Sequence, residues 1–130
     1  MKSDRYQRDP RYRHAFDTLG KRWVGLILRI LLRGPLHFNE LTQRIDGMSD
    51  PVLSARLKEL IQEGIIKRGM HAGPPVRVVY CLTEKGYALR PVIEAITSWS
   101  MCWIDSDTSS TSTNCRCNKD NLEILTHGTE

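Results

Sequence analysis

Hydrophobic residues recur at helical spacing through the first half of the chain. The longest series occupies positions i, i+3, i+4, i+7 and i+8, and consists of Trp23, Leu26, Ile27, Ile30 and Leu31. This spacing predicts an amphipathic helix over residues 21–33, and Pro35 ends it because proline cannot continue the backbone hydrogen bonds. Shorter helices are predicted over residues 11–19 and 39–45. The buried side of the 39–45 helix is expected to be Phe38, Leu41 and Ile45.

The next helix has the clearest start signal in the sequence. Ser49 can cap the free amides, Asp50 favours the positive end of the helix, and Pro51 suits the first helical position. The helix is expected to end at Gly64. Its core face is predicted to be Leu53, Leu57, Leu60 and Ile61.

The pattern then changes to that of strands. Residues 65–68 and 76–82 are rich in β-branched side chains, and the turn formers of residues 71–75 lie between them. This predicts a β-hairpin with a stiffened tip. A last helix is predicted from Glu84 to about residue 104, and Pro91 kinks it or splits it in two.

The last predicted helix is more apolar than one buried face requires. Its apolar residues are Val92, Ile93, Ile96, Trp99, Met101, Trp103 and Ile104. Small domains rarely expose such a patch unless it is an interface. We therefore expect it to pack on the first helix and on a second copy of the chain. Residues 105–130 are expected to form a disordered, acidic tail after a single domain over residues 11–104.

The charge is distributed unevenly. Residues 1–100 carry 17 Lys and Arg against 10 Asp and Glu, a difference of +7, while residues 101–130 carry 2 against 5, a difference of −3. A basic folded part suits a polyanionic partner, although a basic surface can also serve solubility alone. The sequence shows no secretory signal and no apolar run near the ~20 residues of a membrane span. We therefore expect a cytoplasmic protein without membrane contact.

Two short helices separated by residues 46–48 and followed by a hairpin predict a winged helix-turn-helix domain, mainly α with a small β-hairpin. Its second helix would bury one face and offer the other to the major groove of duplex DNA. The positions predicted to contact DNA are Ser49, Asp50, Pro51, Val52, Ser54, Ala55, Arg56 and Lys58. Taken alone, the same pattern also fits an ordinary helix with a solvated face.

The hairpin and the preceding helix supply further candidates for DNA contact. Arg68, His71 and Arg77 would form a basic loop that reaches phosphates or the minor groove, although Arg77 could instead pair with a carboxylate. Asn39 and Thr42 lie at the front of the helix before the turn. They are candidates for phosphate contacts, and simple helix caps are the alternative.

Four motifs in order make the chain similar to a known family. They are GKRW at 20–23, GPLHFNEL at 34–41, MSDPVLSARLKEL at 48–60 and PPVRVVYCLTEKG at 74–86. Over about residues 11–104 the chain resembles the HxlR family, once called the domain of unknown function 24 and related to MarR-type regulators. The resemblance implies cytoplasmic homodimers, built through the first and last helices, that grip a pseudo-palindromic operator. Family members that sense oxidants have a cysteine near the start of the first helix, and this chain has none around residues 9–11.

The sequence therefore predicts a dimeric transcription regulator, more specifically a repressor, with double-stranded DNA as its partner. We expect no enzyme activity, no metal and no cofactor, since no catalytic or nucleotide-binding signature is present. A pocket between the dimer helices and the DNA-binding part could admit an unknown small-molecule effector. Two alternatives remain: a winged-helix module that binds another protein, and a redox- or metal-responsive switch using Cys102, Cys115 and Cys117. One residue between Cys115 and Cys117 is a poor spacing for a shared zinc ion.

Overall fold

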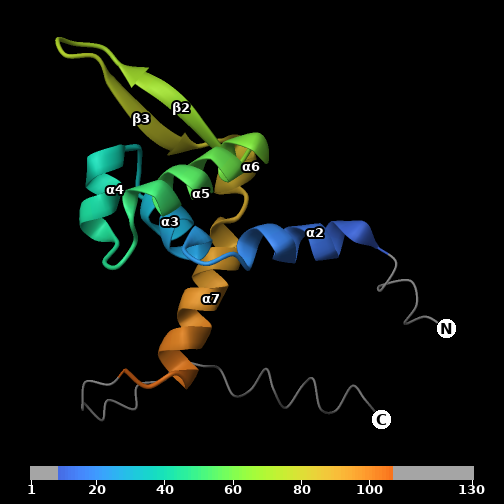
Figure 1. Ribbon diagram of the computed structural model, residues 1–130. Helices are drawn as coiled ribbons and strands as arrows, with labels where there is room; N and C mark the ends of the chain where they lie inside the picture. The colour runs from blue at the N-terminus through green and yellow to red at the C-terminus, as the bar shows by residue number, and fades with distance from the viewer. Residues whose placement is uncertain (1–8, 107–130) are drawn as a thin grey trace, which may run out of the picture. The chain divides into compact units, whose positions relative to one another are not determined.

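The computed structural model describes residues 9–106 and is mainly α-helical with one small antiparallel sheet, as the sequence predicts (Figure 1). The chain divides into two compact units, with the boundary in the sequence between Arg90 and Pro91. The elements in chain order are α2 (Pro10–Leu19), α3 (Val24–Leu31), β1 (Leu36–His37), α4 (Phe38–Arg44), α5 (Asp50–Gln62), β2 (Ile66–His71), β3 (Arg77–Leu82), α6 (Glu84–Tyr87) and α7 (Arg90–Trp103).

Helix α3 begins three residues later than the hydrophobic pattern predicts. Trp23 lies at φ 79°, in the left-handed region, and so precedes the helix as its cap. A non-glycine residue rarely adopts this conformation, but the guanidinium of Arg22 lies 4.7 Å from the centre of the Trp23 ring and stabilises the corner by a cation–π contact. The later start turns the buried face. Leu28 is buried in place of the predicted Leu26, which is 45% exposed.

The core of the first unit lies between α3 and α5. The buried positions of α3 are spaced i, i+3, i+4 and i+7: Val24, Ile27, Leu28 and Leu31. Three of the four residues predicted for the core face of α5 are buried, namely Leu53, Leu57 and Leu60, whereas Ile61 is half-buried. Leu41 and Ile45 of the α4 segment are buried as predicted, and Phe38 is half-buried.

The turn between α4 and α5 ends at Ser49, which caps the start of α5 as predicted. Ser49 precedes α5 with its Oγ accepting from the backbone N–H of Val52 at 3.4 Å. Asp50 takes the first helical position and Pro51 the second, one residue later than predicted, and both positions lie in the turn where amides lack helical partners. Gly64, at φ 74°, ends the helix in the left-handed conformation.

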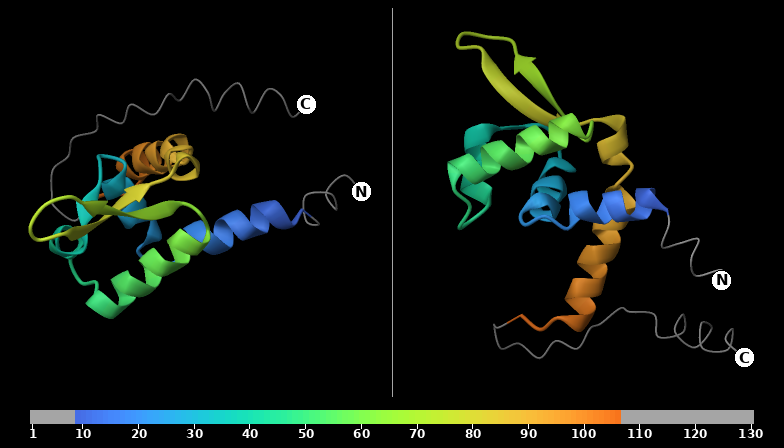
Figure 2. Two further views of the ribbon diagram at one scale, coloured as in Figure 1. Left: turned by 90° about the horizontal axis from the view of Figure 1, so that it is seen from above. Right: turned by 45° about the vertical axis from the view of Figure 1, so that its right-hand side comes forward.

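The predicted hairpin is present and gains a third strand. Strands β2 and β3 pair antiparallel from Ile66 opposite Leu82 out to His71 opposite Arg77. The sequence also predicts a short extended piece at residues 36–38, before α4. Its first two residues form β1, which pairs with β3, so the strand order is β1-β3-β2. Figures 1 and 2 show the tip of the hairpin projecting on the side of α4, while α2 leaves the unit on the opposite side.

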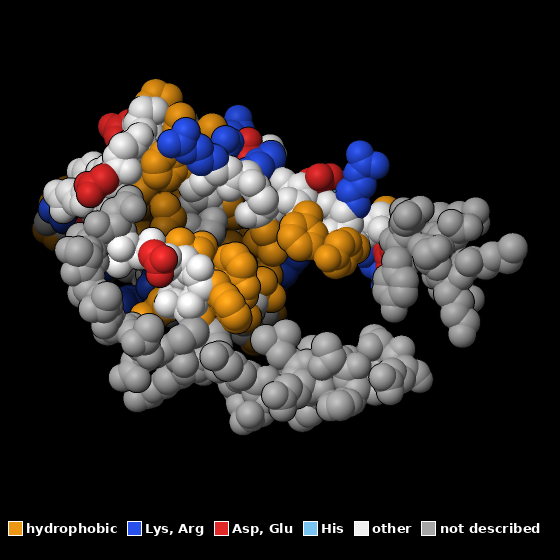
Figure 3. All heavy atoms as spheres, turned by 90° about the horizontal axis from the view of Figure 1, so that it is seen from below, with side chains coloured by type: hydrophobic (Ala, Val, Ile, Leu, Met, Phe, Trp, Pro, Cys, Tyr) orange, Lys and Arg blue, Asp and Glu red, His pale blue; other side chains and the backbone are white. Residues whose placement is uncertain are grey.

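Pro91 splits the last predicted helix into α6 and α7. Thr83 caps α6 by accepting from the N–H of Gly86 at 3.2 Å, and its hydroxyl also lies 3.1 Å from the carbonyl of Ile65. In α7 the only buried residue is Ile93. Its large exposed apolar side chains are Val92, Ile96, Trp99, Met101 and Trp103. Hydrophobic side chains can be seen at the surface in Figure 3.

Candidate nucleic-acid interface

The outer face of α5 is a continuous exposed stripe. Pro51, Ser54, Ala55 and Lys58 are all exposed and follow the spacing i, i+3, i+4 and i+7, which places them on one side of the helix. The side chains of this stripe are small near the start of the helix, and the last of them is the cation Lys58. Asp50 is also exposed at the first helical position, and Val52 is half-buried. This stripe matches the shape that a helix needs in a groove about 12 Å wide.

Arg56 lies on the flank of α5, and its side chain is hydrogen-bonded to other residues of the protein. Its Nε donates to the backbone carbonyl of Arg22 at 3.0 Å, and its Nη1 lies 3.3 Å from the carboxylate of Glu59. Lys21 forms a second ion pair with Glu59 at 3.2 Å. Of the two cations predicted to contact DNA from α5, Lys58 therefore belongs to the exposed stripe and Arg56 braces the helix.

The far end of α5 is tied to α2. The imidazole of His14 lies 2.7 Å from the carboxylate of Glu63, the residue that follows the helix. This hydrogen bond is the main reason that the pKa of Glu63 is lowered from its usual range, with smaller contributions from the charges of Lys85 and Lys21. The ion pair of Glu59 with Lys21 and the hydrogen bond of Glu63 with His14 link α5 to α2 and to the segment that follows α2.

The hairpin separates its predicted basic residues onto two faces. His71 and Arg77 are directly opposite each other across β2 and β3, so their side chains share a face. Arg68 pairs with Tyr80 and lies at the alternate register, on the face that includes the buried pair Ile66 and Leu82. The structure therefore brings His71 and Arg77 together and places Arg68 on the opposite side. The side chains of Arg68, His71 and Arg77 are all exposed.

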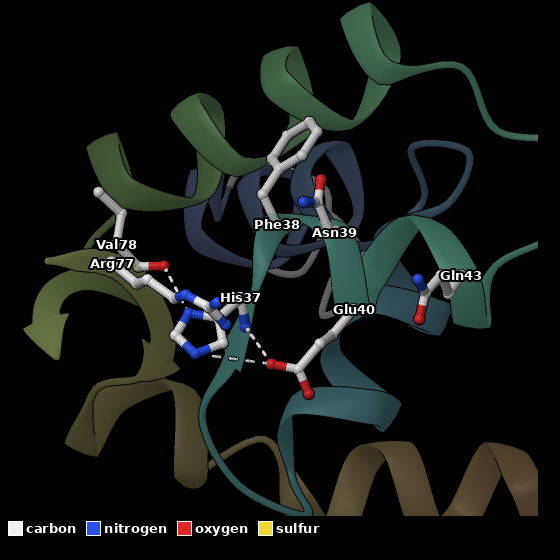
Figure 4. Close-up of a pocket in the computed structure, with 7 residues that line it drawn as sticks. All are labelled: His37, Phe38, Asn39, Glu40, Gln43, Arg77 and Val78. Carbon is white, nitrogen blue, oxygen red and sulfur yellow. Dashed lines mark hydrogen bonds and ion pairs between the residues drawn. The ribbon is translucent and has the colours of Figure 1, made fainter. Parts of the chain in front are cut away.

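A surface cavity of about 520 Å³ lies where the hairpin meets α4 (Figure 4). Its lining joins Arg77 and Val78 of β3 to the first turn of α4. The complete lining is His37, Phe38, Asn39, Glu40, Gln43, Arg77 and Val78. Asn39, predicted to contact DNA, is exposed here. Thr42 is half-buried, and its hydroxyl donates to the backbone carbonyl of Asn39 at 2.8 Å. This hydrogen bond within the helix favours a local structural role for Thr42 over a phosphate contact.

Sequence reasoning missed His37, Glu40 and Gln43, which also line this cavity. The backbone N–H of His37 donates to the carboxylate of Glu40 at 3.1 Å, the carboxylate half of a capping box. The spacing of three residues between His37 and Glu40 is the signal that could have located this contact. The His37 ring nitrogen Nδ1 lies 3.1 Å from the backbone carbonyl of Val78.

The described residues do not form a metal site. Residues 9–106 contain no cluster of three His, Cys, Asp or Glu side chains that could hold a metal ion. Cys115 and Cys117, the tail cysteines of the predicted switch, lie outside the described residues. Cys102 on α7 is disulfide-bonded, and Cys81 is a free thiol. No helix in the described part of the chain is long and apolar enough to cross a membrane.

Helices α3, α4 and α5 followed by the β2–β3 hairpin have the order of a winged helix-turn-helix protein, a class in which the last of the three helices enters the major groove. A family model described as HxlR-like helix-turn-helix matches residues 18–108. The chain belongs to this family, and solved regulators of the MarR family are also similar in structure.

Individual relatives are transcription regulators. The HTH-type transcriptional regulator YvaP of Bacillus subtilis is 47% identical over 96 residues, which are 74% of this chain and 89% of YvaP. The reduced form of the transcriptional regulator YodB from B. subtilis is 42% identical, with a TM-score of 0.68 over 75% of this chain and 95% of YodB. YodB has also been solved diamide-treated and quinone-bound. The redox regulator HypR in its oxidized form is 27% identical, with a TM-score of 0.69 over 73% of this chain and 98% of HypR.

Proposed function

We propose that this transcription regulator is a repressor that binds a pseudo-palindromic operator in double-stranded DNA as a homodimer. The observation that carries the proposal is the exposed stripe of α5, which ends in Lys58, while the half-buried Arg56 is hydrogen-bonded to the backbone of Arg22. A compact DNA-binding domain acts most simply by occupying a promoter. We expect it to act in the cytoplasm, on chromosomal DNA.

The two parts of the interface have different roles in this proposal. Pro51 and Ala55 suit apolar contact with thymine methyl groups, Ser54 suits either a donor or an acceptor on a base edge, and Lys58 suits guanine or phosphate. His71 and Arg77 would contact the sugar–phosphate backbone or the narrow minor groove beside it. Arg68 would contribute to the long-range attraction of DNA more than to this contact, since it lies on the other face of the hairpin.

Dimerisation is proposed because α2 and α7 each leave large apolar side chains exposed. On α2, Tyr12 and Phe16 are 68% and 60% exposed, and their ring centres are 5.0 Å apart. On α7, Trp99 and Trp103 are 57% and 56% exposed. Aromatic side chains are enriched in the cores of protein–protein interfaces. A two-fold dimer would present two α5 helices about 34 Å apart, one turn of DNA.

The experiment is a binding measurement with genomic DNA fragments at increasing salt. We expect selected fragments to contain an inverted repeat and to bind more weakly as salt rises. Lys58→Ala should weaken binding, whereas Arg33→Ala, which removes an exposed cation that is not among the residues proposed to contact DNA, should have little effect. A folded protein that binds no fragment at low salt would refute the proposal. If binding to another protein survived Lys58→Ala and Arg77→Ala, a protein-binding function would replace it.

A second proposed function is a response to thiol oxidation. Its support is the disulfide at Cys102, together with the diamide-treated and quinone-bound structures of the similar regulator YodB. In a sample first reduced to free thiols, we expect diamide, which oxidises two thiols to one disulfide, to change the DNA affinity of the full chain. We expect both Cys102→Ser and removal of residues 105–130 to abolish that change. Cys81→Ser is the matched control, since Cys81 is a free thiol on β3. An unchanged response in the truncated chain would exclude the tail cysteines.

A further inference from the structure

His37 lies where β1 ends, α4 begins and the surface cavity opens. Its Nδ1 is 3.1 Å from the backbone carbonyl oxygen of Val78 on β3. Because a carbonyl oxygen only accepts, Nδ1 must carry the proton and donate it. The backbone N–H of the same residue donates to Glu40, whose carboxylate also lies 3.8 Å from the ring Nε2. Both nitrogens of the imidazole are therefore oriented by named partners.

This side chain continues the sheet beyond the end of β1. Backbone pairing between β1 and β3 stops with His37 opposite Val79. Val78 is the next residue of β3 beyond this last pair. Its backbone carbonyl accepts a hydrogen bond from the His37 imidazole in place of a backbone N–H of β1. A backbone carbonyl in a half-buried strand needs a hydrogen-bond partner, and His37 supplies it with a side chain that is only 25% exposed.

The residue next to Val78 is Arg77, the cation that the proposed function assigns to the DNA backbone. Register places His37, His71 and Arg77 on one face of the sheet, and the rings of His37 and His71 are 5.9 Å apart. Arg77 and His37 line the same cavity, where Figure 4 shows the Arg77 side chain extending toward the imidazole. The first turn of α4, with Asn39, forms the other side of that cavity.

We propose that His37 is a positioning residue for DNA binding: its Nδ1–H fixes β3 at Val78 and thereby holds Arg77 at the cavity that Asn39 also lines, where Arg77 can contact a phosphate of the duplex backbone. The inference rests on the proposed DNA-binding function and adds a requirement for a donor at one atom. His37 acts through Arg77 and does not itself contact the phosphate. Its role depends on hydrogen bonding and not on its charge.

The test compares two substitutions of His37 in the full chain. The amide of asparagine can take the place of Nδ1, whereas phenylalanine keeps the ring and removes the donor. We expect His37→Phe to weaken operator binding about tenfold, the effect of one lost charge-assisted hydrogen bond. The slope of log K against log salt should fall by about 0.9, the value for one phosphate. His37→Asn should keep most of the affinity and the full slope.

Arg77→Ala completes a double-mutant cycle. If His37 acts by holding Arg77, adding His37→Phe to Arg77→Ala should cost little more affinity than Arg77→Ala alone. Fully additive losses, equal losses for His37→Phe and His37→Asn, or no loss for His37→Phe would each overturn the inference while the wild-type protein still bound DNA. Absence of wild-type binding would instead refute the proposed function itself.

Two measurements separate positioning from general damage. Circular dichroism must show that the variants fold, and His37→Leu replaces His37→Phe if the latter does not. Long-range ¹H–¹⁵N correlations of the imidazole in the free protein should show the proton on Nδ1 when the ring is neutral. A neutral ring protonated on Nε2 would contradict the proposed hydrogen bond without reference to DNA.

Discussion

Arg56 donates its Nε–H to the backbone carbonyl of Arg22 at 3.0 Å, across a sequence separation of 34 residues. That carbonyl belongs to the corner before α3, where Trp23 lies at φ 79° and the Arg22 guanidinium covers its ring. The contact joins the helix proposed to enter DNA to the start of the central core helix. Arg56 thus contributes to the placement of α5, and its neighbour Lys58 remains exposed.

Arg56→Ala and Lys58→Ala should affect different properties. Losing the hydrogen bond to Arg22 should lower the free energy of unfolding by about 1 kcal/mol, measured by thermal denaturation. Lys58→Ala should leave stability within about 0.5 kcal/mol and weaken DNA binding, with a salt slope lower by about 1. Unchanged stability together with a reduced salt slope in Arg56→Ala would show that Arg56 contacts DNA directly.

Ser49 should reveal its capping role through a pair of substitutions. Ser49→Ala removes the acceptor for the Val52 amide and should cost about 1 kcal/mol of stability. Ser49→Asp keeps an acceptor and should restore stability, but its negative charge should weaken binding to the DNA backbone. Denaturation and binding measured on the same samples check both statements. Equal stability of the two variants would contradict the cap.

Leu53 and Ser54 are adjacent in α5 and face opposite ways. Leu53 is fully buried, so Leu53→Ala should leave a cavity and lower the free energy of unfolding by about 3 kcal/mol. Ser54→Ala removes an exposed hydroxyl from the stripe and should leave the melting temperature nearly unchanged. Any effect of Ser54→Ala on affinity should then depend on the operator sequence, which a panel of single-base variants would measure.

The elements that sequence predicts well are those in which pattern and packing agree. The capped start at Ser49 and the period of Leu53, Leu57 and Leu60 located α5 almost to the residue. The start of α3 was wrong because nothing in the sequence indicates that an aromatic residue, Trp23, takes positive φ. The Arg22 guanidinium over the Trp23 ring stabilises that conformation, and the later start of α3 changes which of its residues are buried.

Two features of the site could not be predicted because they depend on distant partners. β1 has only two residues, too few for any alternation, and it becomes a strand only by pairing with β3. Arg56 looked like a free cation because its acceptor, the Arg22 carbonyl, is a backbone atom that no residue type identifies. The DNA contacts themselves remain predictions for every residue assigned to them.

The contact between His14 and Glu63 should make stability depend on pH. Folding lowers the pKa of Glu63, so the ionised carboxylate stabilises the protein above the ordinary glutamate pKa, and this contribution is lost as pH falls through the lowered value. His14→Ala should move the Glu63 pKa back toward its usual range, as followed by carboxyl carbon chemical shifts. Lys85→Gln should move it less, since the Lys85 charge is a smaller cause. The opposite order would contradict the assigned hydrogen bond.

Trp99 offers a test of the proposed dimer. This side chain is 57% exposed on α7, and Trp99→Lys should place a charge in an apolar interface and shift the protein toward monomer. Size-exclusion chromatography with light scattering gives the mass directly. Ser98→Lys, at an exposed neighbouring position, is the matched control and should leave the mass unchanged. A dimer that survives Trp99→Lys would place the interface elsewhere.

The third strand supports only the root of the hairpin. β1 pairs with Val79 and Tyr80, so the outer part that ends with His71 opposite Arg77 is a two-stranded ribbon. A two-stranded ribbon alone is marginally stable in water, and its amides should exchange with solvent through local opening far below the free energy of global unfolding. When such a tip binds DNA, the conformational entropy lost in ordering it offsets part of the favourable binding free energy. The stiffness of the free ribbon, and not only its contacts, therefore sets how much of that energy is observed as affinity.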